Sequence, residues 1–272
     1  MAPSAGASGQ APVIGVFDSG FGGLTVLREL LAVMPGADYL YFGDTARLPY
    51  GSKSAHTVAK YAISSAHFLQ QRGAEILVIA CNTATALALD HIQSAVTLPV
   101  IGVVAPGAQR AAEISKTKKA AVIATEATVA SHAYEKALRA HGIQSQEKAC
   151  PLLVPLVEEG WIDHPVTEQV SHIYIDQIFH NGANGADVLL LGCTHYPLLR
   201  PMLRRIVPAH VQIVDSAEST AQAVAACVRD LAPGVTGRVR CFATDSIDKF
   251  RRLGGRFLGR PIEDIELIDI EG

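Results

Sequence analysis

The chain has 272 residues, of which 49% are hydrophobic and 18% charged, as is typical of a globular protein with a large buried core. Its net charge of −3 and its pI near 6.4 argue against a nucleic-acid-binding surface, and no apolar run approaches the roughly 18–20 residues that a membrane-spanning helix needs. The five cysteines form no Cys-x-x-Cys pair, so a reducing cytoplasmic setting is expected rather than a disulfide framework.

The first half of the chain is predicted to alternate strands and helices after a disordered arm. The arm, residues 1–12, is rich in Ala, Ser and Gly and has neither the basic nor the apolar region of a secretory signal. Strands are expected at 13–17, 38–42, 76–80 and 99–104, and helices at 24–33, 54–72 and 82–95. Pro106 and Gly107 then indicate a break, where we place a domain boundary.

The second half of the chain repeats this plan. Strands are expected at 120–124, 152–157, 188–192 and 211–214, and helices at 131–141 and 167–179. The tail is predicted to form a helix near 220–231, a strand at 239–243, a helix at 247–257 and a strand at 265–268. We expect this tail to return to the first half and pack on it.

The repeat predicts an α/β fold of two pseudo-symmetric, doubly wound domains with mainly parallel sheets and the active site in the cleft between them. The first domain is expected to comprise residues 13–105 plus about 216–272, and to carry Asp18 and Cys81. The second is expected to comprise residues 106–215, and to carry Glu158 and Cys193.

Matched cysteines follow a strand in each half. Residues 76–85 read ILVIACNTAT and residues 188–196 read VLLLGCTHY, so Cys81 and Cys193 occupy corresponding places. Such places lie at the ligand-binding edge of a parallel sheet, where the N–H groups of the next helix favour a thiolate. One cysteine of this kind is more often a small core residue, whereas two in a repeat favour a function. Facing each other across a cleft, one would remove a proton from one face of a carbon while the other delivers a proton to the opposite face.

Other uses of the two cysteines are weighed against this one. No metal site is expected, because Cys193 and His195 lack a familiar zinc-ligand spacing and no Cys-x-x-Cys supplies further ligands. Disulfide exchange between Cys81 and Cys193 stays open, since their separation in sequence does not determine their distance in space.

Three residues are candidate companions of the thiols. Asp18 ends the first predicted strand and would accept or relay a proton from Cys81, and His195 would do the same beside Cys193. Glu158 ends the strand predicted at 152–157. The alternatives are that Asp18 is a helix cap, His195 a surface side chain and Glu158 a solvated carboxylate.

Small polar residues dominate the same segments. Arg47 is the nearest cation, so a small carboxylate would be held by hydroxyl groups and helix N–H groups rather than by a fixed charge. No lysine stands at a plausible Schiff-base position, which argues against pyridoxal phosphate.

Five motifs in order resemble those of the glutamate racemases, within the aspartate/glutamate racemase superfamily. They are FDSGFGGLTV (17–26), LPYGSKS (48–54), ACNTAT (80–85), LVEEG (156–160) and GCTHYP (192–197). The resemblance implies a cofactor-independent enzyme that interconverts L- and D-glutamate with Cys81 and Cys193 as the two bases, and that supplies D-glutamate for peptidoglycan synthesis.

The resemblance also implies the substrate contacts and partners. The contacts would be Asp18, Ser19, Pro49, Tyr50, Gly51, Asn82, Thr83, Thr125, Thr128, Thr194 and His195. The expected partner is glutamate, with no nucleic acid and no membrane, while a homodimer stays open.

Two other functions stay open at this point. One is a racemase or isomerase of the same superfamily that acts on aspartate or another small acid. The other is a non-catalytic binding protein with its cleft between two α/β lobes.

Overall fold

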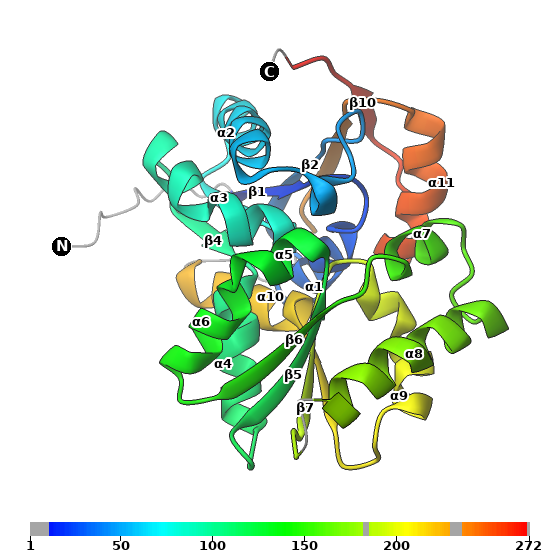
Figure 1. Cartoon of the computed structure of the whole chain (residues 1–272). Helices are drawn as coiled ribbons and strands as arrows, with labels where there is room; N and C mark the ends of the chain where they lie inside the picture. The colour runs from blue at the N-terminus through cyan, green and yellow to red at the C-terminus, as the bar shows by residue number, and fades with distance from the viewer. Residues whose placement is uncertain (1–10, 182–184, 229–235, 271–272) are drawn as a thin grey trace.

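The structure is a computed structural model that describes residues 11–181, 185–228 and 236–270 (Figure 1). The predicted arm at 1–12 lies outside these residues except for its last two positions. No helix in the described ranges is both long and apolar enough to cross a membrane.

Two parallel sheets form the framework. The larger has the strand order β10-β9-β2-β1-β3-β4 and the smaller has the order β6-β5-β7-β8. The strands of the larger sheet are β1 (Val13–Asp18), β2 (Asp38–Gly43), β3 (Ile76–Ile79), β4 (Val100–Gly102), β9 (Val239–Ala243) and β10 (Ile265–Leu267). Those of the smaller are β5 (Lys119–Ala124), β6 (Gln144–Ala149), β7 (Val188–Gly192) and β8 (Gln212–Asp215). The predicted α/β fold class is therefore confirmed.

Helices cover the faces of both sheets, and the two sheets occupy different halves of the molecule in Figure 1. Those that follow strands of the larger sheet are α1 (Leu24–Val33), α2 (Ala55–Gln71), α3 (Asn82–Ala95), α4 (Val104–Ile114) and α11 (Ile247–Leu258). The others are α5 (Glu126–Ser131), α6 (Ala133–Ala140), α7 (Leu153–Glu158), α8 (Pro165–Asn181), α9 (Arg200–Ile206) and α10 (Ser216–Cys227). Short 3₁₀ turns lie at Tyr50–Ser52 and Tyr196–Leu199.

The internal repeat is visible in the strand orders. The order β2-β1-β3-β4 in the first sheet is matched by β6-β5-β7-β8 in the second. The central strands β1, β3, β5 and β7 are apolar except for Asp18 at the end of β1 and Lys119 at the start of β5, because helices cover both faces, and β7 is wholly buried. In each half the order reverses beside the first strand, which is where ligands bind in such sheets. β3 and β7 stand at that place, so the residues that follow them are set at equivalent points of the two halves.

The tail returns to the first sheet. β9 pairs with β2 in parallel register and β10 pairs with β9, so the last strands extend the sheet that the first strand began. The chain enters the second sheet after α4 and leaves it after β8. The domain limits at 105/106 and 215/216 stay a prediction.

The strand predicted at 152–157 is wrong. Helix α7 covers most of that segment, and Pro155 is compatible with its first turn, whereas the same proline would interrupt a central strand. Leu153 and Val157, one helical turn apart, are its buried residues. The strand equivalent to β2 is instead β6, whose sequence QSQEKA conceals it because an edge strand has few fully buried positions.

The break predicted at Pro106-Gly107 is also wrong. Both residues lie inside α4, where Pro106 occupies the first turn and costs no internal hydrogen bond. The helix predicted at 131–141 is divided, since His132 adopts a left-handed conformation between α5 and α6. α10 begins at Ser216, earlier than predicted, because the Asp215 side chain caps it by accepting from two backbone N–H groups; the predicted end at 231 lies outside the described residues.

We predict that Asp187 stabilises the turn before β5. Its Oδ1 accepts a hydrogen bond from Ser115 Oγ at 2.7 Å, and its Oδ2 accepts from the backbone N–H groups of Lys116 and Thr117 at 2.6 and 3.0 Å. Burial alone would raise the pKa of Asp187, but these hydrogen bonds lower it to about 2. Asp187→Asn should lower the free energy of unfolding at pH 7 by about 1.5–3 kcal/mol, because a charged acceptor is lost.

The pH dependence follows from the lowered pKa. The ionised carboxylate contributes its full stabilisation above its ordinary pKa of 3.8 and loses it as the pH falls through about 2. Urea unfolding at pH 7 and at pH 3 should therefore show a smaller difference between Asp187→Asn and the parent at the lower pH. Asp176→Asn, an exposed change on α8, is the control. A constant difference at both pH values would contradict the assignment.

Candidate active site

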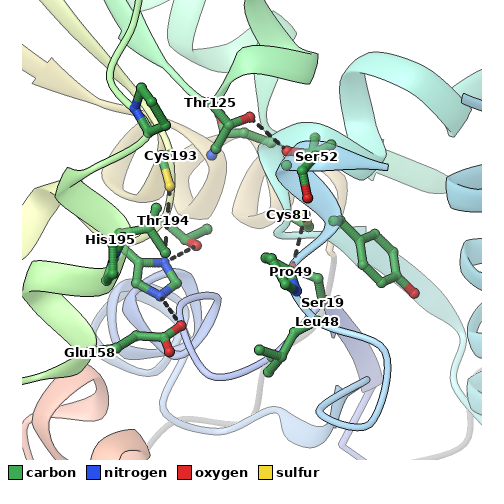
Figure 2. Close-up of a pocket in the computed structure, with 18 of the residues that line it drawn as sticks. Ser19, Leu48, Pro49, Ser52, Cys81, Thr125, Glu158, Cys193, Thr194 and His195 are labelled. Atoms are coloured by element: carbon green, nitrogen blue, oxygen red, sulfur yellow. Dashed lines mark hydrogen bonds and ion pairs between the residues drawn. The ribbon is translucent and has the colours of Figure 1, made fainter. Parts of the chain in front are cut away.

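A cavity of about 160 Å³ lies where the carboxyl ends of the two sheets meet (Figure 2). Its walls come from the loops after β1, β2, β3, β5, β6 and β7, as the position of the two cysteines predicts. Among the described residues that line it, none is lysine or arginine. The lining residues are Ser19, Gly20, Phe21, Leu48, Pro49, Tyr50, Gly51, Ser52, Cys81, Asn82, Thr83, Thr125, Glu126, Pro151, Val154, Pro155, Glu158, Cys193, Thr194 and His195.

Cys81 caps helix α3 on one side of the cavity. Its Sγ accepts from the Ala84 N–H and donates to Ser19 Oγ, both at 3.4 Å. Burial and the nearby negative charge of Asp18 raise the pKa of the Cys81 thiol to about 12, although these hydrogen bonds act to lower it. The side chain is therefore a thiol at neutral pH and is ready to give a proton.

Asp18 lies behind this wall and does not line the cavity. Its carboxylate is 1% exposed, and Oδ2 accepts from the Gly20 N–H at 2.9 Å. Oδ1 has no hydrogen-bond partner in the described part of the chain. Burial raises the pKa of Asp18 despite the positive charge of His195 and three backbone N–H groups that lower it. A buried carboxylate with a raised pKa and an unused oxygen is suited to exchanging protons.

Cys193 lies on the opposite side, with an imidazole for a neighbour. The Cys193 Sγ is 4.0 Å from His195 Nδ1, and the other ring nitrogen, Nε2, is 3.2 Å from Glu158 Oε1 (Figure 2). Burial alone would lower the pKa of His195, but hydrogen bonds to Cys193 and Glu158 raise it to about 10. The ring is therefore an imidazolium at neutral pH, which is the counter-charge that a thiolate needs.

Three further residues hold the His195 imidazole in place. Glu158, at the end of α7, is 3.8 Å from Lys249 Nζ, and the edge-to-face contact of Phe257 with the His195 ring has a centroid distance of 4.9 Å. Burial alone would raise the pKa of Glu158, but His195 and Lys249 lower it. Lys249 and Phe257 both belong to α11, so the tail contacts the Cys193 side of the site. Sequence reasoning missed both, since no motif marks them.

Most residues predicted to contact substrate line the cavity, but two do not. Asp18 and Thr128 lie behind it, and Thr128 hydrogen-bonds to Thr83 and Thr125. Tyr50 reaches the cavity, although its hydroxyl donates to Asp44 at 2.6 Å. The predicted residues that do line it are Ser19, Pro49, Tyr50, Gly51, Asn82, Thr83, Thr125, Thr194 and His195. Unpredicted ones include Ser52, which belongs to the LPYGSKS motif, Pro151, and also Val154 and Pro155, which the mistaken strand concealed.

Comparisons with known proteins agree with this geometry. A family model described as Asp/Glu/Hydantoin racemase matches residues 14–224. A glutamate racemase from Koribacter versatilis is 57% identical over 97% of this chain and 100% of its own length. Two solved structures are similar over 96% of this chain. A glutamate racemase from Francisella tularensis in complex with D-glutamate has 34% identity, a TM-score of 0.88 and 98% coverage. One from Thermus thermophilus in complex with β-chloro-D-alanine has 41% identity, a TM-score of 0.85 and 97% coverage.

We predict that Gly22 is required for the position of His195. A Cβ at Gly22 would collide with Thr194 Oγ1 and with the His195 ring. Gly22→Ala should displace His195 from Cys193 and slow the alkylation of Cys193 by iodoacetamide, because Cys193 loses its cationic neighbour. Mass spectrometry of the alkylated peptide gives the rate.

The matched control is Gly107→Ala. Its Cβ would meet Ser216 at 3.4 Å, which is ordinary contact. Gly22→Ala should also lower the free energy of unfolding by about 1–3 kcal/mol, as overpacking does. Equal alkylation rates in both variants would show that the loop tolerates the methyl group.

Proposed function

Because this chain belongs to the Asp/Glu/hydantoin racemase family and is an isomerase, we propose that it interconverts L- and D-glutamate by two-base proton transfer. The resemblance stated from the sequence motifs is thereby confirmed at the level of the family. One observation carries the mechanism: two cysteines at equivalent strand ends of a repeated sheet reach one cavity from opposite sides (Figure 2).

Cys193 removes the α-proton of L-glutamate in this proposal. The C–H bond breaks, an S–H bond forms at Cys193, and the electron pair stays on the substrate as a carbanion. The Cys81 thiol then gives its proton to the opposite face, which produces D-glutamate and leaves a thiolate at Cys81. The imidazolium of His195 beside Cys193 and the high pKa of Cys81 support Cys193 as the base and Cys81 as the acid in this direction.

Removal of a proton from D-glutamate requires the reverse charge state. Cys81 must then lose its proton, and Asp18 is the neighbouring base. Its raised pKa and its unpartnered Oδ1 support a proton relay between Asp18 and Cys81. Asp18 holds the proton while Cys81 is a thiolate and returns it when Cys81 becomes a thiol again. Glu158 acts through His195 by keeping the ring protonated and oriented.

Hydrogen-bond donors around the cavity support a substrate with carboxylate groups. Asn82 is 2% exposed, its Oδ1 accepts from Tyr134 at 2.6 Å, and its Nδ2 has no partner within the described chain. Since Asn82 lines the cavity at the first turn of α3, a carboxylate there would receive an amide N–H and backbone N–H groups. We infer that the predicted contact residues hold glutamate in this way, with no cofactor.

The role of the product is inferred from the family. D-glutamate made by this chain would supply peptidoglycan synthesis in the cytoplasm. The test is incubation of the protein with L-glutamate and no added cofactor, followed by optical rotation. Decay of the rotation to zero is expected. No change with glutamate but decay with L-aspartate would overturn the substrate, and tight binding without decay would overturn the enzymatic proposal.

We predict that Cys81→Ala and Cys193→Ala each abolish racemisation. One base per face is needed, so loss of either thiol should lower kcat by at least about 10²–10⁴-fold while the fold is kept. Cys227→Ala, at an exposed position outside the cavity, is the control and should keep the parent rate. Near-parent racemisation by Cys193→Ala would exclude the two-base mechanism.

We predict that Glu158→Gln moves the alkaline limb of kcat/KM to lower pH. Glu158 helps to raise the pKa of His195 from 6.5 to about 10, so the protonated ring and its ion pair are fully present below about pH 6.5 and are lost as the pH rises through about 10. Without the carboxylate the limb should fall by about one pH unit or more. Glu159→Gln is the exposed neighbouring control, and an unchanged limb in Glu158→Gln would remove Glu158 from the mechanism.

A further inference from the structure

Three side chains with metal-ligating atoms converge outside the catalytic cavity. They are His132, between α5 and α6, Glu135, in the first turn of α6, and Glu147, on β6 (Figure 1). His132 Nδ1 is 3.0 Å from Glu135 Oε2 and 3.4 Å from Glu147 Oε2, and the ligating atoms all lie within 4.8 Å of one another. None of the three lines the cavity, so this cluster is separate from the proposed proton transfer.

Glu147 is the member that points to a ligand. Its side chain is 6% exposed, and neither of its oxygens makes a hydrogen bond of ordinary distance and angle in the described part of the chain, where the Glu135 backbone N–H and the His132 ring give it weaker support. The ring of His132, itself 59% exposed, is its ion-pair partner there. Burying a carboxylate without well-formed hydrogen bonds is costly, and a bound cation would offset that cost.

We propose that His132, Glu135 and Glu147 bind one divalent transition-metal ion of the zinc class. Zn²⁺ takes imidazole nitrogen and carboxylate oxygen at about 2.0–2.2 Å, which separates the ligand atoms of a tetrahedral site by about 3.3–3.6 Å. The distances of 3.0 and 3.4 Å from His132 Nδ1 are close to that separation. The imidazole disfavours Mg²⁺ and Ca²⁺, which prefer all-oxygen sites with six or more ligands.

The surroundings complete the site. Arg139 donates to Glu135 Oε1, which leaves Oε2 directed at His132 and orients the carboxylate as a supporting hydrogen bond does in metal sites. Because the His132 side is open to solvent, a water molecule supplies the fourth ligand.

A metal here would tie the α5–α6 connection to the edge strand β6. α5 begins at Thr125, which lines the cavity, and the residues just after β6 lead to Pro151, which also lines it. The ion would act as a structural clamp beside the site. The proposal does not depend on the racemase activity.

Equilibrium dialysis against Zn²⁺, with metal counting by mass spectrometry, tests the site on the full chain. The parent should bind one more Zn²⁺ than His132→Ala and Glu147→Gln, or bind it at least about tenfold more tightly. His91→Ala and Glu113→Gln remove the same groups at exposed positions and should bind as the parent does. The parent and the four variants all keep Cys81 and Cys193. Any zinc that these cysteines bind is therefore the same in every protein and does not affect the difference.

A spectroscopic measurement identifies the donor atoms. Co²⁺ bound at this site should show the visible bands of a tetrahedral nitrogen and oxygen environment that disappear in Glu147→Gln, without the sulfur-to-metal band that cysteine ligands would add. Zn²⁺ should also raise the melting temperature of the parent more than that of Glu147→Gln. Equal zinc content, equal Co²⁺ spectra and an equal shift in melting temperature across the variants would overturn the proposal and leave the cluster an ion pair only.

Discussion

Buried and half-buried hydrogen bonds between the two halves of the molecule are the constraint on which the site depends. Tyr134 of α6 donates to Asn82 of α3 at 2.6 Å, and Thr83 bonds Thr125 at 3.0 Å. On the other side, Thr25 Oγ1 donates to the Thr194 carbonyl at 3.2 Å. Each bond joins a residue that follows a strand of the larger sheet to a residue that follows a strand of the smaller sheet. Because buried polar groups without partners are costly, these pairs fix how the two carboxyl edges face each other.

The two cysteines occupy equivalent places in the repeat, but their environments differ. Cys81 is surrounded by buried groups and by the charge of Asp18, which favours the thiol, whereas Cys193 has the imidazolium of His195 as its neighbour. Two cysteines in identical environments would have no preference for which one acts as the base and which as the acid. The departure from symmetry therefore separates the proposed acid from the proposed base before substrate arrives.

The series of side-chain contacts that stabilises the His195 imidazolium joins residues from distant segments of the sequence. His195 follows β7, Glu158 ends α7, and Lys249 belongs to α11. The pairing of β9 with β2 sets the position of α11. The strand register of the first sheet therefore determines where Lys249 lies relative to His195, which follows a strand of the second sheet. Phe257 adds a ring contact that holds the imidazole from the same helix.

The sequence by itself determined the places of the two cysteines. The apolar runs before Cys81 and Cys193 predicted buried parallel strands, and small polar residues after them predicted a ligand-binding edge. The same pattern failed at 152–157, because a short apolar run fits a helix face as well as a strand. It also missed β6, since edge strands need little apolar character.

The tertiary structure alone decided which residues meet. Glu158 reaches His195 from helix α7 rather than from a strand end, and Asp18 lies behind the wall of the cavity rather than in it. Neither fact follows from local patterns, because the orientation of a side chain at the sheet edge depends on how the two halves pack. The strength of a base depends on burial and on neighbouring charges, so the pKa values of Cys81 and His195 could be set only after packing brought their partners together.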